Sequence, residues 1–326
     1  MKPLKVTFFG TPYFSARLLD KILVNKNLPI EILFVLTQQD KPTGRKKIIT
    51  PSPVKLIALK HHIPVYYYIS EIPASLFSAI DLCLVYSYGY IIPAQFLNTP
   101  RFGLWNIHPS LLPKYRGPSP IAYPLLLGDK ETGVTLMKMD EKIDHGNLIA
   151  QEKLSIDPDD SRLDLEIKLT DTGYELFIKT VVKLISTKCI TFHPKEQDHL
   201  HATYTQLLTK DHGFVALEII KKALCGEQIV EDALPSLVKE YLTHYPHEET
   251  NFLKVTFNFS ILIFNLYRAL STWPGIWTKV IIKGQEKRLK LTNMSFEQNK
   301  LYLNRVKLEG KKEVDFIQFN NAYNIF

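Results

Sequence analysis

An asparagine and a histidine stand two residues apart in the stretch NIHPSLLPKYRG, at positions Asn106 and His108. The apolar residues before them predict a buried strand, and side chains at positions i and i+2 of a strand project from the same face. Because Pro109 and Pro113 cannot donate to a sheet ladder, we expect the strand to end near His108 and to lead the pair into a surface loop. A strand end that opens into such a loop is where α/β folds place their sites.

The spacing of this pair leaves a structural interpretation open, because a strand-end asparagine also caps turns and a histidine also binds a backbone carbonyl. A third polar group would favour chemistry, and the turn MDEKIDHGNL offers Asp140, Glu141 and Asp144. In a doubly wound sheet the carboxyl-end loops of neighbouring strands meet, so we expect this turn to reach the pair. Asp144 is favoured because it precedes a glycine in a tight turn, although aspartate also forms turns for structural reasons alone.

An asparagine, a histidine and an aspartate together favour acyl-group chemistry without a covalent enzyme intermediate. The first supplies a neutral N–H donor, the second a donor that can exchange a proton, and the third an orienting group and proton acceptor. A tetrahedral oxyanion is the species that this set would stabilise. No GxSxG motif accompanies the pair, so the nucleophile is expected to come from a substrate.

The length and composition predict a two-domain globular protein. A chain of 326 residues exceeds the usual size of one domain and can bury a sizeable core. The three cysteines, Cys83, Cys189 and Cys225, are scattered and form no CxxC pair, so neither a disulfide framework nor a zinc ribbon is indicated. The first apolar run is too short for a signal peptide, and no run approaches a membrane span. We therefore expect a cytoplasmic protein without membrane contact.

The positive charge of the chain is concentrated in two places. The formal net charge is +7, and one basic cluster, Lys41, Arg45, Lys46 and Lys47, lies in a Pro/Gly loop. The other lies near the C-terminus, at Lys279, Lys283, Lys287, Arg288, Lys290, Lys300, Arg305, Lys307, Lys311 and Lys312. Two separated basic patches suggest an extended polyanion such as nucleic acid, although either patch alone could be solvated surface charge.

Alternating elements in the first half of the chain predict an α/β fold with a doubly wound parallel sheet. We expect strands at 4–9, 30–36, 65–67, 81–86, 102–108, 132–139 and 147–155, and helices from 13, at 53–61 and at 163–185. The polar segment 191–205 is interpreted as a connection. Its histidines, His193, His199 and His201, are not interpreted as a metal site, because they form no recognised metal-binding motif.

Short alternating runs between 281 and 319, after a helix around 216–223, predict a small antiparallel barrel or sheet. An oligonucleotide-binding (OB-like) barrel would fit the interleaved charges and aromatics, as would the exposed face of another small β domain. The expected domains are 1–190 and 209–326, joined by a linker at 191–208.

Seven segments spread over most of the chain carry a resemblance to a known family. They are FFGTPYF, TQQDKPTGR, PSPVK, YSYGYIIP, NIHPSLLPKYRGPSPI, GDKETGVTLMKMDEKIDHGNLI and RALSTWPGIWT. Together they resemble the methionyl-tRNA formyltransferases. The N-x-H, SLLPKYRG and D-x-G motifs are shared by the wider family of 10-formyltetrahydrofolate-dependent transferases and hydrolases. The TQQDKPTGR loop with PSPVK, and the TWPG segment, are typical of the tRNA enzymes. The resemblance implies a Rossmann-like catalytic domain followed by a smaller OB-like tRNA-binding domain.

The resemblance also implies a reaction and its residues. A formyl group would pass from 10-formyltetrahydrofolate to the α-amino group of methionine on initiator methionyl-tRNA, with Asn106, His108 and Asp144 as catalytic residues. Neither metal, nucleotide cofactor nor DNA is implied, and we expect a monomer. Folate would lie along two loops, at Tyr88, Gly89, Tyr90 and Ile91 and at Ser110, Leu111, Leu112 and Pro113. The tRNA acceptor region would meet Lys41, Arg45, Lys46 and Lys47, with Arg45 as the characteristic arginine.

The chain departs from this family in three places, and three other functions stay open. Its GRKK loop is one residue shorter than the commoner form, the acidic segment 209–252 is longer, and the C-terminal region matches only through GKKEVD and DFIQF. Formylation of an amino sugar or another small amine, hydrolysis of formyltetrahydrofolate, and RNA binding without catalysis are the alternatives. The basic clusters argue against a small substrate, the fused second domain argues against the hydrolase, and convergence of the three polar side chains would favour an enzyme.

Overall fold

The structure is a computed structural model that describes residues 3–44, 46–186, 194–228, 234–246, 252 and 258–326. It divides into two compact units. The first comprises Met1–Arg116, Gly133–Leu154 and Glu166–Tyr204, and the second comprises Gly117–Thr132, Ser155–Leu165 and Thr205–Phe326. The expected domain bounds of 1–190, 191–208 and 209–326 stay a prediction.

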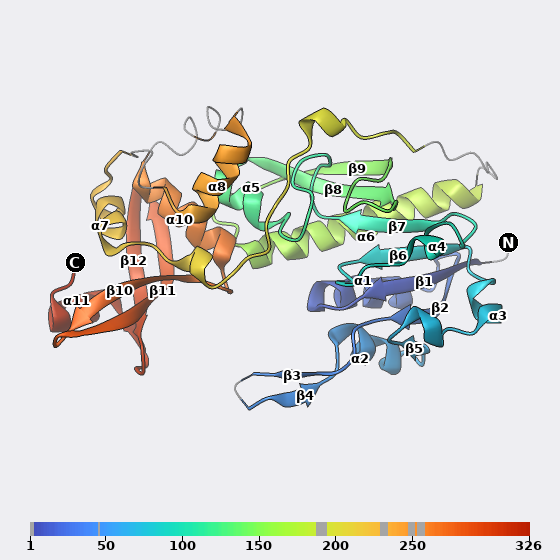
Figure 1. The fold of residues 1–326 in the computed structure, drawn as a ribbon, viewed down its shortest axis with the longest axis horizontal. Helices are drawn as coiled ribbons and strands as arrows, with labels where there is room; N and C mark the ends of the chain where they lie inside the picture. The colour runs from blue at the N-terminus through green and yellow to red at the C-terminus, as the bar shows by residue number, and fades with distance from the viewer. Residues whose placement is uncertain (1–2, 45, 187–193, 229–233, 247–251, 253–257) are drawn as a thin grey trace. The chain divides into compact units, whose positions relative to one another are not determined.

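A seven-stranded sheet in the order β5-β2-β1-β6-β7-β8-β9 forms the first unit (Figure 1). Its strands are β1 Leu4–Gly10, β2 Ile30–Leu36, β5 Val65–Tyr66, β6 Leu82–Tyr86, β7 Leu104–His108, β8 Glu131–Lys138 and β9 Leu148–Ser155. Its helices are α1 Tyr13–Val24, α2 Pro53–Lys60, α3 Ala74–Phe77, α4 Ala94–Leu97 and α6 Arg162–Ser186, with short 3-10 helices at η1 Ile69–Glu71 and η2 His199–His201. The predicted strands and helices are thus confirmed to within a few residues.

Apolar side chains cover both faces of this sheet, as a doubly wound fold requires. In β6, Cys83 and Val85 join a core cluster with Phe77 and Leu97 of the short helices α3 and α4. Tyr86 faces the other way, where its hydroxyl lies 3.0 Å from the Thr170 hydroxyl of α6. The all-buried β6 sequence LCLVY follows from this double cover.

One strand pair differs from the expected parallel sheet. The pairs β2 with β5, β1 with β2, β1 with β6, and β6 with β7 are parallel, but β7 and β8 are antiparallel, with Lys138 opposite Trp105. The segment between them holds only the short helix α5, Ala122–Leu127, and the chain re-enters the sheet at the end where it left. The turn after β8 therefore starts beside the amino end of β7. The turn does reach His108, but the reason expected for this contact was wrong: β7 and β8 are antiparallel, so their carboxyl ends do not meet at one edge of the sheet.

The basic loop upstream is a two-stranded hairpin formed by β3 Lys41–Thr43 and β4 Ile48–Thr50. The described residues between Lys41 and Thr50 are all exposed, including Ile48 and Ile49. This hairpin places Lys46 and Lys47 at its solvent-exposed tip, whereas Arg45 lies outside the described residues.

The second unit contains a four-stranded antiparallel sheet, in the order β10-β11-β12-β13, consistent with a small barrel. The strands are β10 Ile276–Ile282, β11 Gln285–Glu297, β12 Lys300–Leu308 and β13 Glu313–Asp315. The helices are α5, α7 Leu217–Cys225, α8 Ser236–His244, α10 Phe259–Leu270 and α11 Phe316–Tyr323, with a 3-10 helix at η3 Asp211–Gly213. Leu289 and Leu291 face the core while the neighbouring Arg288 and Lys290 are exposed, which is the alternation expected of a half-buried strand.

No helix in the described ranges has both the length and the apolar character needed to cross a membrane.

An ion-paired aspartate joins the helices α1 and α6 in the first unit. Asp171 lies 2.8 Å from Arg17 Nη2 and 3.0 Å from Lys21 Nζ. Desolvation by burial raises the pKa of Asp171, but hydrogen bonds from Arg17 and Lys21 outweigh it, so that the pKa lies below its usual value. The carboxylate therefore contributes stability above its unfolded pKa of about 3.9 and loses that contribution as the pH falls toward the folded value.

We expect Asp171→Asn to lower the free energy of unfolding at pH 7, because its ion pairs with Arg17 and Lys21 are lost. The loss should be only about 1 kcal/mol, because these side chains are partly exposed and solvent screens the pairs. The difference from the parent should narrow below about pH 4. Thermal denaturation between pH 7 and pH 3 measures both effects, with Glu175→Gln on the exposed face of the same helix as the matched control. An unchanged melting temperature at pH 7, or a gap that does not narrow in acid, would contradict the assignment.

Candidate active site

The end of β7 presents Asn106 and His108 on one face of the sheet, as the sequence predicted. Ile107 points to the opposite face, where it approaches Gly173 of α6 so closely that an added β-carbon would lie 2.9 Å from Ile107 Cγ2. His108 is buried and Asn106 is half-buried. Within the described part of the chain no hydrogen bond holds the Asn106 carboxamide, so its N–H group is available to a ligand.

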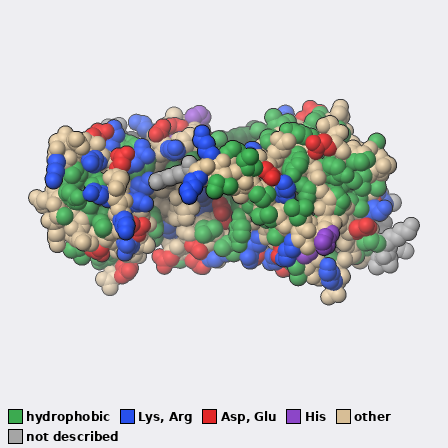
Figure 2. Space-filling model, turned by 90° about the horizontal axis from the view of Figure 1, so that it is seen from below, with side chains coloured by type: hydrophobic (Ala, Val, Ile, Leu, Met, Phe, Trp, Pro, Cys, Tyr) green, Lys and Arg blue, Asp and Glu red, His purple; other side chains and the backbone are tan. Residues whose placement is uncertain are grey.

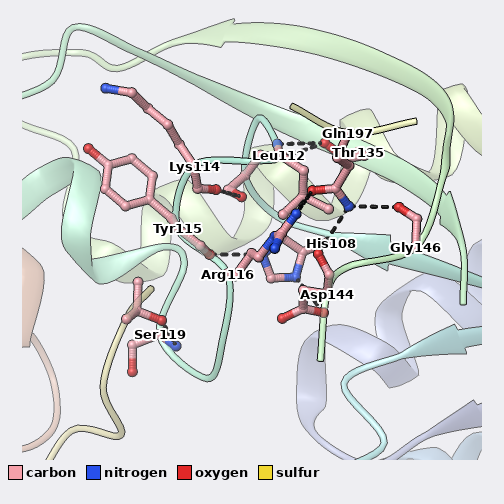
Figure 3. A network of polar contacts seen from close by, with 12 residues as sticks. His108, Leu112, Lys114, Tyr115, Arg116, Ser119, Thr135, Asp144, Gly146 and Gln197 are labelled. Carbon is pink, nitrogen blue, oxygen red and sulfur yellow. Dashed lines mark hydrogen bonds and ion pairs between the residues drawn. The ribbon is translucent and has the colours of Figure 1, made fainter. Parts of the chain in front are cut away.

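His108 is held between a carbonyl and a carboxylate (Figure 3). Its Nε2 lies 3.0 Å from the Tyr115 carbonyl oxygen, and its Nδ1 lies 3.4 Å from Asp144 Oδ1. Because a carbonyl can only accept, the first contact places a proton on Nε2. A neutral ring would then turn the lone pair of Nδ1 toward the carboxylate, so attraction between the two groups requires a further proton on one of them. This arrangement suits proton transfer.

Asp144 is the one member of the acidic turn that reaches His108. Its backbone is left-handed, with φ at +49°, and its side chain is only 13% exposed. Asp140 instead braces the turn by accepting from the Lys142 N–H at 3.0 Å and binding His145 Nδ1 at 2.6 Å, and Glu141 is exposed. A β-carbon on Gly146 would lie 1.8 Å from the Lys138 carbonyl oxygen, so only glycine fits where the turn passes this strand.

The loop after β7 is fixed by side chains from the neighbouring strands. The buried Thr135 hydroxyl donates to the Ser110 carbonyl at 2.7 Å and accepts from the Leu112 N–H at 3.1 Å. Gln151 of β9 donates to the Leu112 carbonyl at 2.8 Å, and the Ser110 hydroxyl donates to Lys114 O at 2.7 Å. Leu112 is buried, and Leu111 and Pro113 are half-buried. Sequence analysis singled out neither Thr135 nor Gln151, although Thr135 lies within the segment GDKETGVTLMKMDEKIDHGNLI.

The second predicted folate loop, Tyr88 to Ile91, has a buried root and an exposed tip. The Tyr88 ring packs on Phe9 in the core, with ring centroids 5.5 Å apart, and its carbonyl accepts from Thr11 Oγ1 at 2.9 Å. Gly89 has a φ of +82°, and an added β-carbon would meet Gln38 Nε2 at 2.7 Å. Tyr90 is half exposed and Ile91 is 94% exposed. Only the tip therefore offers apolar side chains to a ligand.

The predicted tRNA-binding residues do not share one environment. Lys41 turns toward this second loop, with its Nζ 2.6 Å from Gln38 Oε1 and 5.6 Å from the centroid of the Tyr90 ring. Lys46 and Lys47 point into solvent. The prediction that these lysines and Arg45 meet tRNA stays a prediction.

A buried arginine and glutamine behind Asp144 were missed by sequence analysis. Arg116 and Gln197 are 1% and 3% exposed, and the Arg116 Nη2 donates to Gln197 Oε1 at 2.6 Å. Arg116 lies within the SLLPKYRG motif, but Gln197 stands in the segment that was interpreted as a plain connection. An isolated glutamine in a polar stretch gives no signal of burial.

The histidines of that segment serve separate contacts. His199 stacks on His145 with ring centroids 4.0 Å apart, and His201 pairs with Asp198 at 2.7 Å. His193 lies outside the described residues. Among the residues that are described, no three His, Cys, Asp or Glu side chains are grouped as metal ligands would be.

Comparisons with known proteins identify the family. A family model described as formyl transferase matches residues 4–194. The methionyl-tRNA formyltransferase of Dictyoglomus thermophilum is 35% identical over 336 residues, covering 99% of this chain and 98% of that protein. The enzyme of the same name from Caldicellulosiruptor saccharolyticus is 30% identical over 355 residues, covering 98% and 97%.

Solved structures support the fold alone. A 4-N formyltransferase from Francisella tularensis is similar with a TM-score of 0.58 at 17% identity, covering 91% of this chain and 100% of that one. The sugar 3N-formyl transferase WlaRD, solved in the presence of dTDP and 5-N-formyl-THF, has a TM-score of 0.54 at 20% identity, covering 93% and 92%. On its near full-length sequence similarity, the chain belongs to the methionyl-tRNA formyltransferase family.

Proposed function

We propose that this protein acts in the cytoplasm and transfers the formyl group of 10-formyltetrahydrofolate to the α-amino group of methionine on initiator methionyl-tRNA. The observation that carries the chemistry is the His108–Asp144 pair beside the unengaged Asn106 carboxamide at the end of β7. The substrate is assigned from sequence similarity to methionyl-tRNA formyltransferases along nearly the whole chain.

The folate co-substrate supplies the formyl group, and two loops have the chemistry to hold it. Leu111, Leu112 and Pro113 form an apolar run that backbone and side-chain hydrogen bonds keep rigid. The exposed apolar tip of the other loop, Tyr90 and Ile91, suits a flat ring system. Tyr88 would contribute through its backbone, because its ring belongs to the core.

We assign the direct hydrogen bond to the developing oxyanion to Asn106. Its N–H group would donate to the formyl oxygen as that oxygen gains negative charge, an interaction worth roughly 3–4 kcal/mol for a well-placed donor. Both ring nitrogens of His108 face protein atoms, so we assign it proton exchange with Asp144 and no direct hydrogen bond to the oxyanion. This narrows the sequence-based expectation that both side chains hydrogen-bond the oxyanion.

Proton balance gives Asp144 its role. The attacking amine has an ordinary pKa of about 7.7–8.0, so much of it is already neutral near pH 7.5. As the new C–N bond forms, the amine must lose a proton, and as the old C–N bond breaks, the leaving folate nitrogen must gain one. Asp144, coupled to His108, would accept the first proton and the pair would return one, so the enzyme ends in its starting state.

Basic side chains on both units support a tRNA partner. In the C-terminal sheet the exposed Lys290 lies opposite the exposed Lys307, an arrangement of like charges that a bound anion would relieve. Lys279 lies opposite Arg288 but is already paired with Glu286 at 2.9 Å. Figure 2 shows lysine and arginine side chains gathered over the part of the molecule that this sheet forms. Together with the exposed hairpin tip, they suit sequence-independent attraction to a phosphate backbone, which weakens as salt rises.

The substrate is tested by transfer of labelled formyl from 10-formyltetrahydrofolate. We expect initiator methionyl-tRNA to be labelled and elongator methionyl-tRNA, free methionine and an amino-sugar nucleotide to stay unlabelled. Turnover with only the sugar or with water would keep the chemistry and contradict the tRNA assignment.

The catalytic residues are tested by Asn106→Ala and Asp144→Asn. Each should lower kcat by about 100-fold or more, because a charge-stabilising donor or the proton acceptor is lost. Glu141→Gln, which changes an exposed carboxylate in the same turn, is the control and should keep parental turnover. Near-normal kcat in either test variant, with substrate at saturation, would remove that residue from the mechanism.

The hairpin is tested by Arg45→Ala. We expect the KM for charged tRNA to rise, because an arginine can bind a phosphate or a base edge of the tRNA. The KM for folate should stay unchanged, because Arg45 is not expected to contact folate. Lys26→Ala, an exposed lysine elsewhere in the same unit, is the matched control. Equal changes in both KM values would show that the loop does not act on tRNA specifically.

A further inference from the structure

The segment Lys195–Tyr204, here called the strap, joins two loops of the candidate active site. At one end Lys195 pairs with Leu148 of β9 through two backbone hydrogen bonds of 2.7 and 2.8 Å. At the other end the Thr203 carbonyl accepts from the Arg116 N–H at 2.8 Å, and the Thr203 N–H donates to the Pro113 carbonyl at 3.2 Å. The strap thus connects the strand after the Asp144 turn with the loop after His108.

Gln197 lies in the middle of the strap and uses its whole amide (Figure 3). Its Nε2 donates to the carbonyl oxygens of Asp144 and Gly146, at 3.0 and 2.7 Å. Its Oε1 accepts from Arg116 Nε and Nη2, at 3.2 and 2.6 Å. Because a guanidinium only donates and a carbonyl only accepts, the amide has one orientation that satisfies all four contacts.

This network holds both partners of the His108 ring. On one side, Gln197 donates to the two carbonyls of the turn in which Asp144 has left-handed backbone geometry, a conformation that is uncommon outside glycine. On the other side, Arg116 is bound next to Tyr115, whose carbonyl accepts from His108 Nε2. The carboxylate and the carbonyl that face the ring are therefore connected through one buried pair of side chains.

We propose that Gln197, together with Arg116, is a positioning residue for the proposed formyl transfer, holding the Asp144 carboxylate against His108. The inference rests on the proposed function, because it assigns Gln197 no contact with substrate. The competing explanation is a merely structural role, in which Gln197 stabilises the packing of the strap and has no effect on Asp144. The two differ in whether the effect of Gln197 depends on the Asp144 carboxylate.

Gln197→Glu is the sharpest variant. It keeps the length of the side chain and an acceptor for Arg116, but it removes both N–H donors and turns a carboxylate toward the carbonyls of Asp144 and Gly146. We expect kcat to fall about 10-fold to 100-fold, with the KM values for folate and charged tRNA within twofold of the parent and little change in melting temperature. His201→Ala, an exposed position on the same strap, is the control. Gln197→Met, which has no hydrogen-bonding amide, should show the same kcat loss.

A double-mutant cycle with Asp144→Asn decides between positioning and structural roles. If Gln197 acts through Asp144, adding Gln197→Glu to Asp144→Asn should change kcat less than twofold, because residues that act as a unit are not additive. If the double variant lost kcat by the product of the two separate fold-changes, the proposal would be overturned. Near-normal kcat in both folded Gln197 variants would also overturn it. Normal turnover of Asp144→Asn itself would overturn the catalytic assignment and this proposal with it, whereas a defective Asp144→Asn beside a normal Gln197→Glu would overturn the positioning role alone.

Discussion

A buried imidazole that faces a carboxylate is the interaction on which the candidate site depends. The side chains of His108 and Asp144 are 5% and 13% exposed, so water contributes little to holding either group in place. A charge in such a place is costly unless partners are fixed around it. The Tyr115 carbonyl fixes one ring nitrogen, and the Asp144 carboxylate must be fixed at the other. Neither partner comes from β7 itself, so the surrounding loops have to be rigid.

The sheet supplies this rigidity at an irregular point in its topology. Up to β7 the described strand pairs of the seven-stranded sheet are parallel, and the chain then reverses, so that β8 enters antiparallel to β7. The loop after His108 and the turn after β8 consequently start from different ends of β7. They are held together by side chains of β8 and β9 and by the strap. Asn106 stays outside this hydrogen-bonded frame, which suits a donor whose partner is the substrate.

The sequence predicted the elements and the face of the candidate site because both follow from local pattern. Alternation placed Asn106 and His108 on one face, and Pro109 ended the strand where the structure ends it. Contact between the Asp144 turn and His108 was predicted from the wrong strand direction, since direction depends on pairing between distant segments. Gln197 could not have been predicted, because its partners lie 53 and 81 residues away and its neighbours show no periodicity. The type of chemistry could be predicted from residue types, but the residues that position the site depend on tertiary contacts and could not.

The root of the basic hairpin differs physically from its tip, although sequence analysis treated them as one cluster. At the base of the hairpin, the hydroxyl of Thr37, which precedes β3, lies 2.7 Å from the hydroxyl of Ser52, which follows β4, and both are buried. Gln38 donates to the Tyr88 carbonyl at 3.4 Å. Lys41 binds Gln38 and faces the Tyr90 ring, so its ammonium belongs to the loop proposed for folate. The exposed Lys46 and Lys47 at the tip are accessible to a polyanion, whereas Lys41 at the root contacts the loop proposed to bind folate. A basic cluster in a sequence therefore need not be one binding surface.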